Sequence, residues 1–224
     1  MRWRQQRQSS NIEDRRGMGR GVALGGGGIG VLIIAALVCL LGGDPRQFLE
    51  GLPAQPQTQQ QPAANNAPPD ENRQFAAAVL GSTEDVFSQI LPAQGGPRYQ
   101  PPTLVLFSGE VSSACGYASA AMGPFYCPGD RKLYLDFAFF NELKREFKAP
   151  GDFAQAYVIA HEVGHHVQNV TGTMAKVQRL QQQVGEAQSN QLSVRLELQA
   201  DCYAGVWANY VQKQGKLEVG DVEE

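Results

Sequence analysis

The sequence contains few histidines, few cysteines and no strong excess of charge of either sign. Its 224 residues include three histidines and four cysteines, and the formal net charge is −3 at pH 7. A charge so close to neutral gives no argument for nucleic acid as a partner. The cysteines also lack the spacing of a cysteine-rich zinc site. The hydrophobic content of 42% is sufficient for one sizeable folded core.

All of the histidines lie between positions 161 and 166, where His161, Glu162 and His165 form the pattern H-E-x-x-H. Histidines four positions apart on a helix project from one face, so their imidazoles can bind one cation. Glu162 lies about 100° around the helix from His161, where its carboxylate can accept a proton from water that the metal activates. This arrangement is typical of zinc peptidases. Ordinary core histidines are the alternative, which the clustering with Glu162 disfavours.

The surrounding residues predict that the motif lies on a buried helix. Pro150 and Gly151 end the preceding element, Asp152 can cap the helix, and Gln155 follows three residues later as in a capping box. Gly164 costs about 1 kcal/mol relative to alanine inside a helix, which indicates close approach of another backbone. His166 lies off the ligand face, and we expect it to be only a neighbour.

Two acidic residues downstream are candidates to complete the site. A zinc ion held by two imidazoles needs a third protein ligand, usually a carboxylate. Glu197 and Asp201 lie four positions apart on an amphipathic helical stretch, and therefore on one face. Glu197 can bind the metal while Asp201 accepts the second N–H of a ligating histidine. Alone, such a pair is usually a solvated face, but after H-E-x-x-H and among apolar residues the ligand role is favoured.

The chain before and after position 97 shows different periodicities. Helical patterns at 71–80 and 82–91 are separated by Gly81, and a further helix is expected at 139–147. Short apolar or alternating runs predict strands at 103–107, 109–113 and 132–136. We therefore expect an α+β domain with a small antiparallel sheet and an active-site helix. An edge strand beside the metal could hold an extended peptide by main-chain pairing.

The first 70 residues are expected to lie outside this domain. Residues 1–20 are rich in arginine without apolar periodicity, which predicts a disordered basic cytoplasmic tail. Residues 21–43 carry no charge and are long enough for the roughly 30 Å of a bilayer core, so we expect a single-pass transmembrane anchor. A cleaved signal peptide is the alternative. Residues 44–70 resemble a disordered Pro/Gln-rich linker. The arginine excess predicts that the N-terminus lies in the cytoplasm and that everything after Gly43 lies outside.

Cys115 and Cys127 are candidates for a disulfide. If the domain lies outside the cytoplasm, an oxidising compartment allows the bond, whose constraint would be worth about 3 kcal/mol. Two free buried thiols are the alternative. Cys202 is expected to be a buried thiol in a helix.

Several longer stretches resemble the bacterial neutral zinc metallopeptidase family. They are Cys115-Gly-Tyr-Ala-Ser, Gly123-Pro-Phe-Tyr-Cys127, Tyr134-Leu-Asp136, the stretch 151–168 around the histidines and Leu196-Glu-Leu-Gln-Ala-Asp-Cys-Tyr-Ala-Gly205. The resemblance covers most of the chain. It implies a zincin-like, gluzincin-type fold with one Zn²⁺, ligands His161, His165 and Glu197, and Glu162 as catalytic base. Because family members continue past Glu224, it also implies that the domain at 71–224 is truncated at its C-terminus.

The residues and the resemblance together predict a membrane-anchored zinc-dependent metallopeptidase that hydrolyses peptide or protein substrates. An inactive zinc-binding scaffold tethered to the membrane is one alternative, and a hydrolase of non-peptide amides such as cell-wall crosslinks is another. Tyr157 and Tyr203 are close to the motifs in sequence, but packing roles are favoured for both, so no residue is assigned to oxyanion stabilisation. The sequence does not indicate an oligomeric state.

Overall fold

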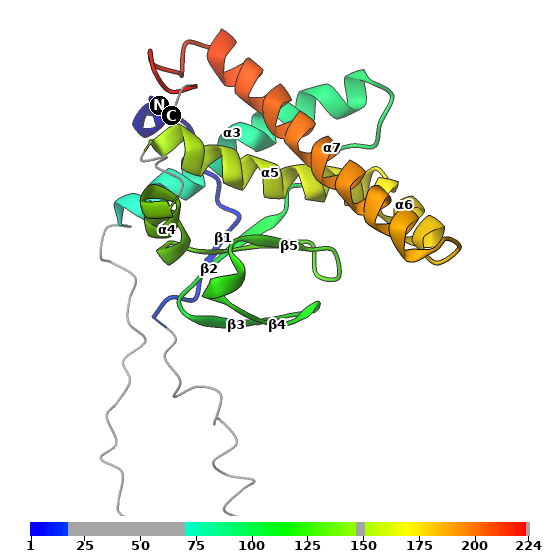
Figure 1. Ribbon diagram of the computed structural model, residues 1–224. Coiled ribbons are helices and arrows are strands. Elements are labelled where there is room, and N and C mark those ends of the chain that lie inside the picture. Colours follow the sequence, from blue (N-terminus) through cyan, green and yellow to red (C-terminus); the bar gives the residue numbers. More distant parts are fainter. Residues whose placement is uncertain (18–69, 147–150, 223–224) are drawn as a thin grey trace, which may run out of the picture. The chain divides into compact units, whose positions relative to one another are not determined.

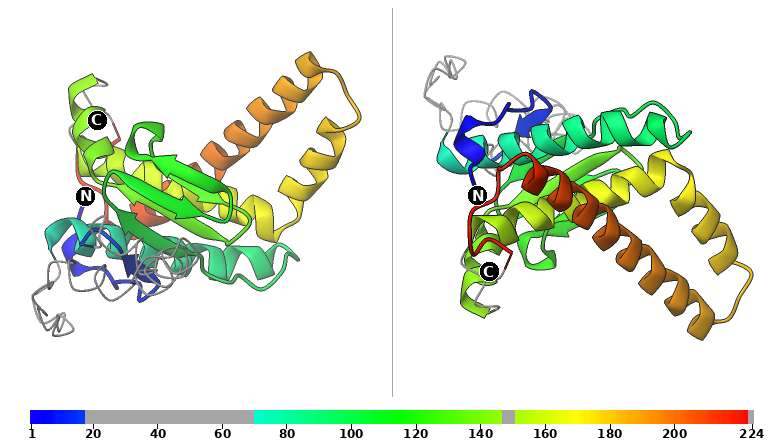
Figure 2. Two further views of the ribbon diagram at one scale, coloured as in Figure 1. Left: turned by 90° about the horizontal axis from the view of Figure 1, so that it is seen from below. Right: turned by 90° about the horizontal axis from the view of Figure 1, so that it is seen from above.

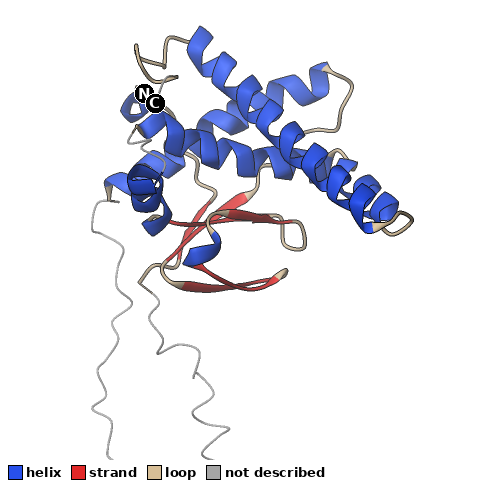
Figure 3. Ribbon diagram, in the orientation of Figure 1, coloured by secondary structure: helices blue, strands red, loops and turns tan. Residues whose placement is uncertain are grey.

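The helices and the strands of the protein lie in separate layers (Figure 1). The structure is a computed structural model, and it describes residues 1–17, 70–146 and 151–222. The helices are α3 (Glu71–Ala93), α4 (Ala138–Glu146), α5 (Asp152–Val170), α6 (Thr173–Gln181) and α7 (Glu186–Lys213), with short 3-10 turns η1 (Trp3–Gln5) and η2 (Ala120–Met122). The strands are β1 (Ile12–Asp14), β2 (Thr103–Phe107), β3 (Glu110–Ser113), β4 (Gly116–Ser119), β5 (Phe125–Cys127) and β6 (Lys132–Asp136). Helices α3, α5 and α7 gather on one side of the sheet (Figure 3), which confirms the α+β class.

The main sheet has the strand order β1-β2-β6-β5, and β3 pairs with β4 in a separate hairpin. Strand β2 is parallel to both β1 and β6, while β5 is antiparallel to β6. The expectation of a small antiparallel sheet is therefore wrong for the main sheet, which is mixed. The reason is that the chain passes through β3, β4 and β5 between β2 and β6, so β6 runs in the same direction as β2. Alternation in a sequence predicts a strand but not its direction.

Helix α3 continues through Gly81, so the prediction of two helices at 71–80 and 82–91 is wrong. Ser82 does not cap a second helix, because its hydroxyl donates to the carbonyl of Val79 at 2.7 Å within α3. Gly81 is explained by a long-range contact instead. A Cβ atom at this position would lie 2.5 Å from the carbonyl oxygen of Arg7, so only glycine allows the N-terminal segment to approach.

Helix α5 is buried against its neighbours, as its apolar pattern predicts. The rings of Phe153 and Trp207 stack with centroids 6.0 Å apart, and the Trp207 indole N–H donates to the Ser82 hydroxyl at 2.8 Å. These contacts join α5 to α7 and α7 to α3. The predicted N-cap is wrong by one residue, because Gly151 is the N-cap and Asp152 begins the helix.

The crossing of α5 and α7 depends on Gly164. A Cβ atom there would lie 2.8 Å from the carbonyl oxygen of Ala200, which confirms that another backbone approaches closely. We expect Gly164→Ala to lower the free energy of unfolding by about 1–3 kcal/mol, because overpacking at the crossing outweighs the gain in helix propensity. Gly205→Ala is the control, since no atom lies within 4 Å of its added Cβ. Urea unfolding measures both variants, and equal stability of the two would contradict the close contact.

Residues 1–17 are not the disordered tail that their composition predicts. Trp3 is buried, and β1 pairs with β2 at the edge of the main sheet. Composition does not predict the order of this segment, because the residues that it packs against lie in α3 and β2, far away in the sequence. In the described ranges, no helix is both long enough and apolar enough to cross a bilayer. The predicted span at 21–43 and nearly all of the predicted linker at 44–70 lie outside the described residues.

Candidate metal centre

His161, His165 and Glu197 come together where α5 crosses α7. The Nε2 atoms of His161 and His165 lie 3.2 and 3.3 Å from the same carboxylate oxygen, Oε2 of Glu197. All three candidate ligand atoms are within 4.8 Å of one another. The histidine side chains are 20% and 14% exposed, whereas that of Glu197 is 59% exposed. The cluster is therefore anchored in the helix packing on one side and open to solvent on the other.

The other ring nitrogen of each histidine is held by a group that fixes its tautomer. Nδ1 of His161 lies 2.9 Å from Oδ1 of Asp201, and because a carboxylate can only accept, Nδ1 carries the proton. Nδ1 of His165 lies 2.9 Å from Oε1 of Gln168. The amide nitrogen of Gln168 donates to the carbonyl of Leu196 at 2.6 Å, so Oε1 is free to accept from Nδ1. A neutral histidine that donates through Nδ1 presents an unprotonated Nε2, and both contacts favour this tautomer.

In this tautomer, three acceptor atoms converge. Two imidazole lone pairs and a carboxylate oxygen repel one another unless a cation lies among them. Two neutral imidazoles and one carboxylate are also the donor set of many catalytic zinc sites with an open fourth position. The residues present therefore fit a zinc ion. The role of Gln168 was missed from sequence, although its position three residues after His165 on the same helix face was an available signal.

Glu162 lies on the same helix but is turned into the protein. It is 9% exposed, and the backbone N–H of Tyr126 in β5 donates to its carboxylate. Burial, and then the negative charge of Glu197, raise the pKa of Glu162 to about 8, and the Tyr126 N–H opposes this shift. A carboxyl group with a raised pKa next to a metal-ligand cluster is suited to exchange protons near neutral pH.

The raised pKa of Glu162 makes the stability of the metal-free protein depend on pH. Between about pH 4.5 and pH 8 the folded protein holds this proton and the unfolded chain does not. The free energy of unfolding therefore falls as the pH rises through this window, by up to about 1.4 kcal/mol per pH unit. In the presence of a metal chelator, we expect the melting temperature to be lower at pH 8 than at pH 6. The melting temperature of Glu162→Gln should depend less on pH. Thermal unfolding of both proteins at both pH values measures the effect, and identical pH dependences would contradict it.

His166 is separate from the cluster and has a structural role. It is 1% exposed, and burial lowers its pKa to about 4, so it is neutral. Its Nε2 donates to the carbonyl of Gln100 at 2.7 Å, and its Nδ1 accepts from the Tyr126 hydroxyl at 3.1 Å. Asn169 also donates to that hydroxyl at 2.7 Å. His166 and Asn169 therefore fasten β5 to α5, which places the Tyr126 N–H against Glu162.

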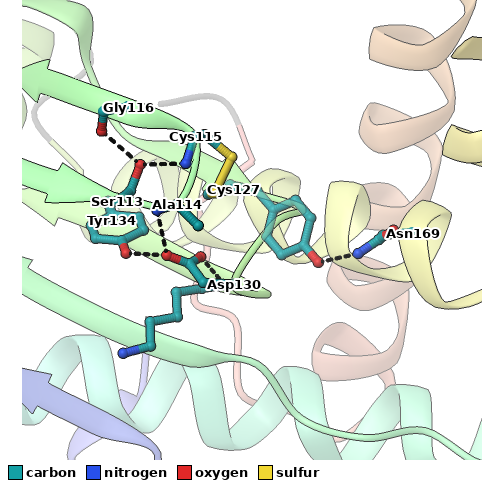
Figure 4. Close-up of a disulfide and its surroundings, with 10 residues drawn as sticks. Ser113, Ala114, Cys115, Gly116, Cys127, Asp130, Tyr134 and Asn169 are labelled. Carbon is teal, nitrogen blue, oxygen red and sulfur yellow. Dashed lines mark hydrogen bonds between the residues drawn. A yellow bond between two sulfur atoms is a disulfide. The ribbon is translucent and has the colours of Figure 1, made fainter.

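Cys115 and Cys127 form a disulfide with Cα atoms 5.8 Å apart (Figure 4). It joins the β3–β4 hairpin to β5, beside Tyr126. Asp130 supports the same region by accepting from the Ala114 N–H at 3.1 Å and the Tyr134 hydroxyl at 2.6 Å. The free thiol of Cys202 is exposed, so the prediction that it is buried is wrong.

The two tyrosines considered from sequence lie outside the cluster. The Tyr157 hydroxyl donates to the backbone carbonyl of Asp201 at 3.2 Å, and so helps to hold α7 against α5. Tyr203 packs edge-on against Phe87 with ring centroids 6.1 Å apart. Neither contact supports a role in oxyanion stabilisation.

The chain is similar to known bacterial proteins over its whole length. The family described as "Putative neutral zinc metallopeptidase" matches residues 1–224. The uncharacterized protein YpfJ of Escherichia coli (strain K12) is 44% identical over 234 residues, covering 100% of this chain and 80% of that protein. The uncharacterized protein Rv2575 of Mycobacterium tuberculosis (strain H37Rv) is 46% identical over 145 residues, covering 63% of this chain and 46% of that protein. No solved structure matches the chain.

Proposed function

Because the chain belongs to the neutral zinc metallopeptidase family, we propose that it is a zinc-dependent peptidase that hydrolyses peptide bonds in peptide or protein substrates. The observation that carries the proposal is the convergence of His161, His165 and Glu197, whose facing atoms are all acceptors in the neutral tautomer that Asp201 and Gln168 favour. Such a cluster calls for a cation. Its solvent-exposed side leaves room for water and substrate.

The three ligands would hold one Zn²⁺. When bound, the ion supplies Lewis acidity, which lowers the pKa of a water molecule and polarises the substrate carbonyl. Asp201 and Gln168 hold the two imidazoles in the ligating tautomer. Asp201 also stabilises positive charge on His161, because its carboxylate accepts the Nδ1 proton.

Glu162 would act as the general base. Its carboxylate takes the proton of the attacking water and then transfers that proton to the leaving amine. The Tyr126 N–H holds the carboxylate in place, and burial keeps the proton affinity of the group high. The structure thus supports a buried carboxyl group beside the candidate ligands that can carry a proton.

Strand β5 is the best candidate to bind an extended substrate. Among the described residues it is at the end of the strand order, so one of its edges has no partner strand there. Main-chain groups of successive residues in an antiparallel strand point alternately toward and away from the partner. The Tyr126 N–H acts on the Glu162 carboxylate, so β5 lies next to the proposed base. A peptide paired with this free edge would therefore run past the catalytic base.

We further propose that the protein is associated with the bacterial cytoplasmic membrane through residues 21–43, with its metal site in an extracytoplasmic compartment. The uncharged sequence of that stretch supports the membrane contact. The Cys115–Cys127 disulfide supports an oxidising compartment, because cytosolic thiols are kept reduced.

Incubation of the full chain with an unfolded, carboxymethylated protein tests the proposed activity. Mass spectrometry identifies new peptide termini before chelation, after chelation, and after one equivalent of zinc is restored. Cleavage that is lost with the metal and returns with it supports the peptidase. Release of crosslinked fragments from cell-wall material, with no cleavage of the protein, would favour a hydrolase of non-peptide amides. One bound zinc with no cleavage of either substrate would favour a scaffold.

A further inference from the structure

Residues Met1–Arg16 lie on the same compact unit as the metal site. Trp3 is 5% exposed, and its ring meets that of Phe75 edge-on with centroids 5.5 Å apart. Strand β1 extends the main sheet, with Ile12 opposite Leu104 in parallel register. Figure 2 shows this segment, in blue, alongside α3. The segment therefore contributes both a strand and core side chains to the folded unit.

Two residues of α3 are explained only by this segment. Glu84 is 7% exposed, and its carboxylate accepts from Ser9 at 2.5 Å, Asn11 at 2.8 Å and Arg7 at 2.9 Å. A buried carboxylate is costly without such donors, and the segment supplies all three. Gly81 supplies the space for the Arg7 carbonyl. Helix α3 thus presents a surface whose occupant is the chain's own N-terminal segment.

The arginines of the segment have acidic partners on the folded unit. Arg4 pairs with Glu71, Arg7 with Glu84 and Asp85, and Arg16 with Asp70. The positive charge of Arg4, Arg7 and Arg16 is therefore used in docking. These three arginines then give no argument for a cytoplasmic N-terminus on the opposite side from the folded domain.

The two ends that flank residues 18–69 are also held together. Nη1 of Arg16 lies 2.8 Å from Oδ2 of Asp70, and Nε of Arg73 lies 4.0 Å from Oδ2 of Asp14. A single crossing of a bilayer would separate Arg16 from Asp70 by the roughly 30 Å of its hydrocarbon core. Such a separation is incompatible with the docked segment.

We propose that Met1–Arg16 is a fixed part of the catalytic unit and lies on the same side of the membrane as the metal site. The chain then returns at Asp70 to the side that it left at Arg16. This replaces the single-pass arrangement expected from sequence. Its basis is the docking surface on α3 and β2, so it does not depend on the proposed peptidase activity.

The sidedness is tested by cysteine labelling of the full chain in sealed spheroplasts. One variant carries Ser10→Cys and another Ala187→Cys, both at exposed positions, with Cys39 and Cys202 replaced by alanine and serine. A membrane-impermeant maleimide should label both reporter cysteines to the same extent. If both lie outside, it labels both in sealed spheroplasts; if both lie inside, it labels both only after the membrane is opened. Labelling of one reporter with protection of the other would overturn the proposal.

Hydrogen exchange of the purified full chain tests the docking itself. The Arg15 N–H donates to the Leu106 carbonyl at 2.8 Å, so its exchange should be slowed at least tenfold relative to an unfolded peptide. Glu84→Ala should reduce this protection, whereas Glu142→Ala, at an exposed position of α4, should not. Exchange of residues 12–15 in the wild type at the unfolded rate would show that the segment is free, and would refute the proposal.

Discussion

Glu162→Gln is expected to lower kcat/KM for peptide hydrolysis by a factor of about 10²–10⁴ while one zinc ion remains bound. Glutamine has nearly the same shape and can still accept from the Tyr126 N–H, but it cannot take a proton from water. The ligands His161, His165 and Glu197 are unchanged. The effect should therefore appear in catalysis and not in metal content.

The measurement combines steady-state kinetics on a defined peptide with metal analysis of each preparation. Glu142→Gln is the matched control, because it makes the same chemical change at an exposed position of α4 and should leave kcat/KM unchanged. If Glu162→Gln kept its zinc and its activity, Glu162 could not be the base. If the variant lost its zinc, Glu162 would be needed for metal binding, and its assignment as a residue that does not bind the metal would be wrong.

The clustering of the candidate ligands could be predicted because most of its geometry is local. His161 and His165 share a face of one helix, and Glu197 and Asp201 share a face of another, so helical periodicity alone defines both pairs. A zinc ion bound by two imidazoles usually takes a carboxylate as its third protein ligand. A carboxylate on the second helix can bind the same ion only if the two helices lie next to each other. Gly164 gave a further hint of their crossing, because glycine inside a helix usually needs a packing reason.

The docked N-terminal segment and the continuous helix α3 were missed because both depend on distant partners. An arginine-rich segment looks disordered unless its acidic partners are known, and here Glu84 and Asp70 lie more than 50 positions away. Gly81 looked like a helix end because its close neighbour, Arg7, belongs to that same segment. The short strand β5 was missed because three residues carry no clear alternation.

The hydrogen bonds behind the ligands lead to a graded prediction for zinc affinity. Asp201→Asn should weaken zinc binding about 10–100-fold, because an amide still contacts Nδ1 of His161 but no longer carries the charge that favours the ligating tautomer. Glu197→Gln should weaken it further, because a ligand and a negative charge are lost together. Glu186→Gln, also on α7 but exposed and outside the cluster, is the control.

Competition with a chromophoric zinc chelator measures the three dissociation constants at one pH, and circular dichroism confirms that each variant is folded. The order of the dissociation constants tests the roles of Glu197 and Asp201 more directly than any single value does. If Glu197 is a ligand and Asp201 an orienting group, the loss of Glu197 must cost more affinity than the loss of the Asp201 charge. A larger effect of Asp201→Asn would reverse the two roles. An affinity of Glu197→Gln equal to that of the control would mean that the third ligand comes from elsewhere in the chain, and that the repulsion among the three acceptors is relieved by a proton instead of a metal.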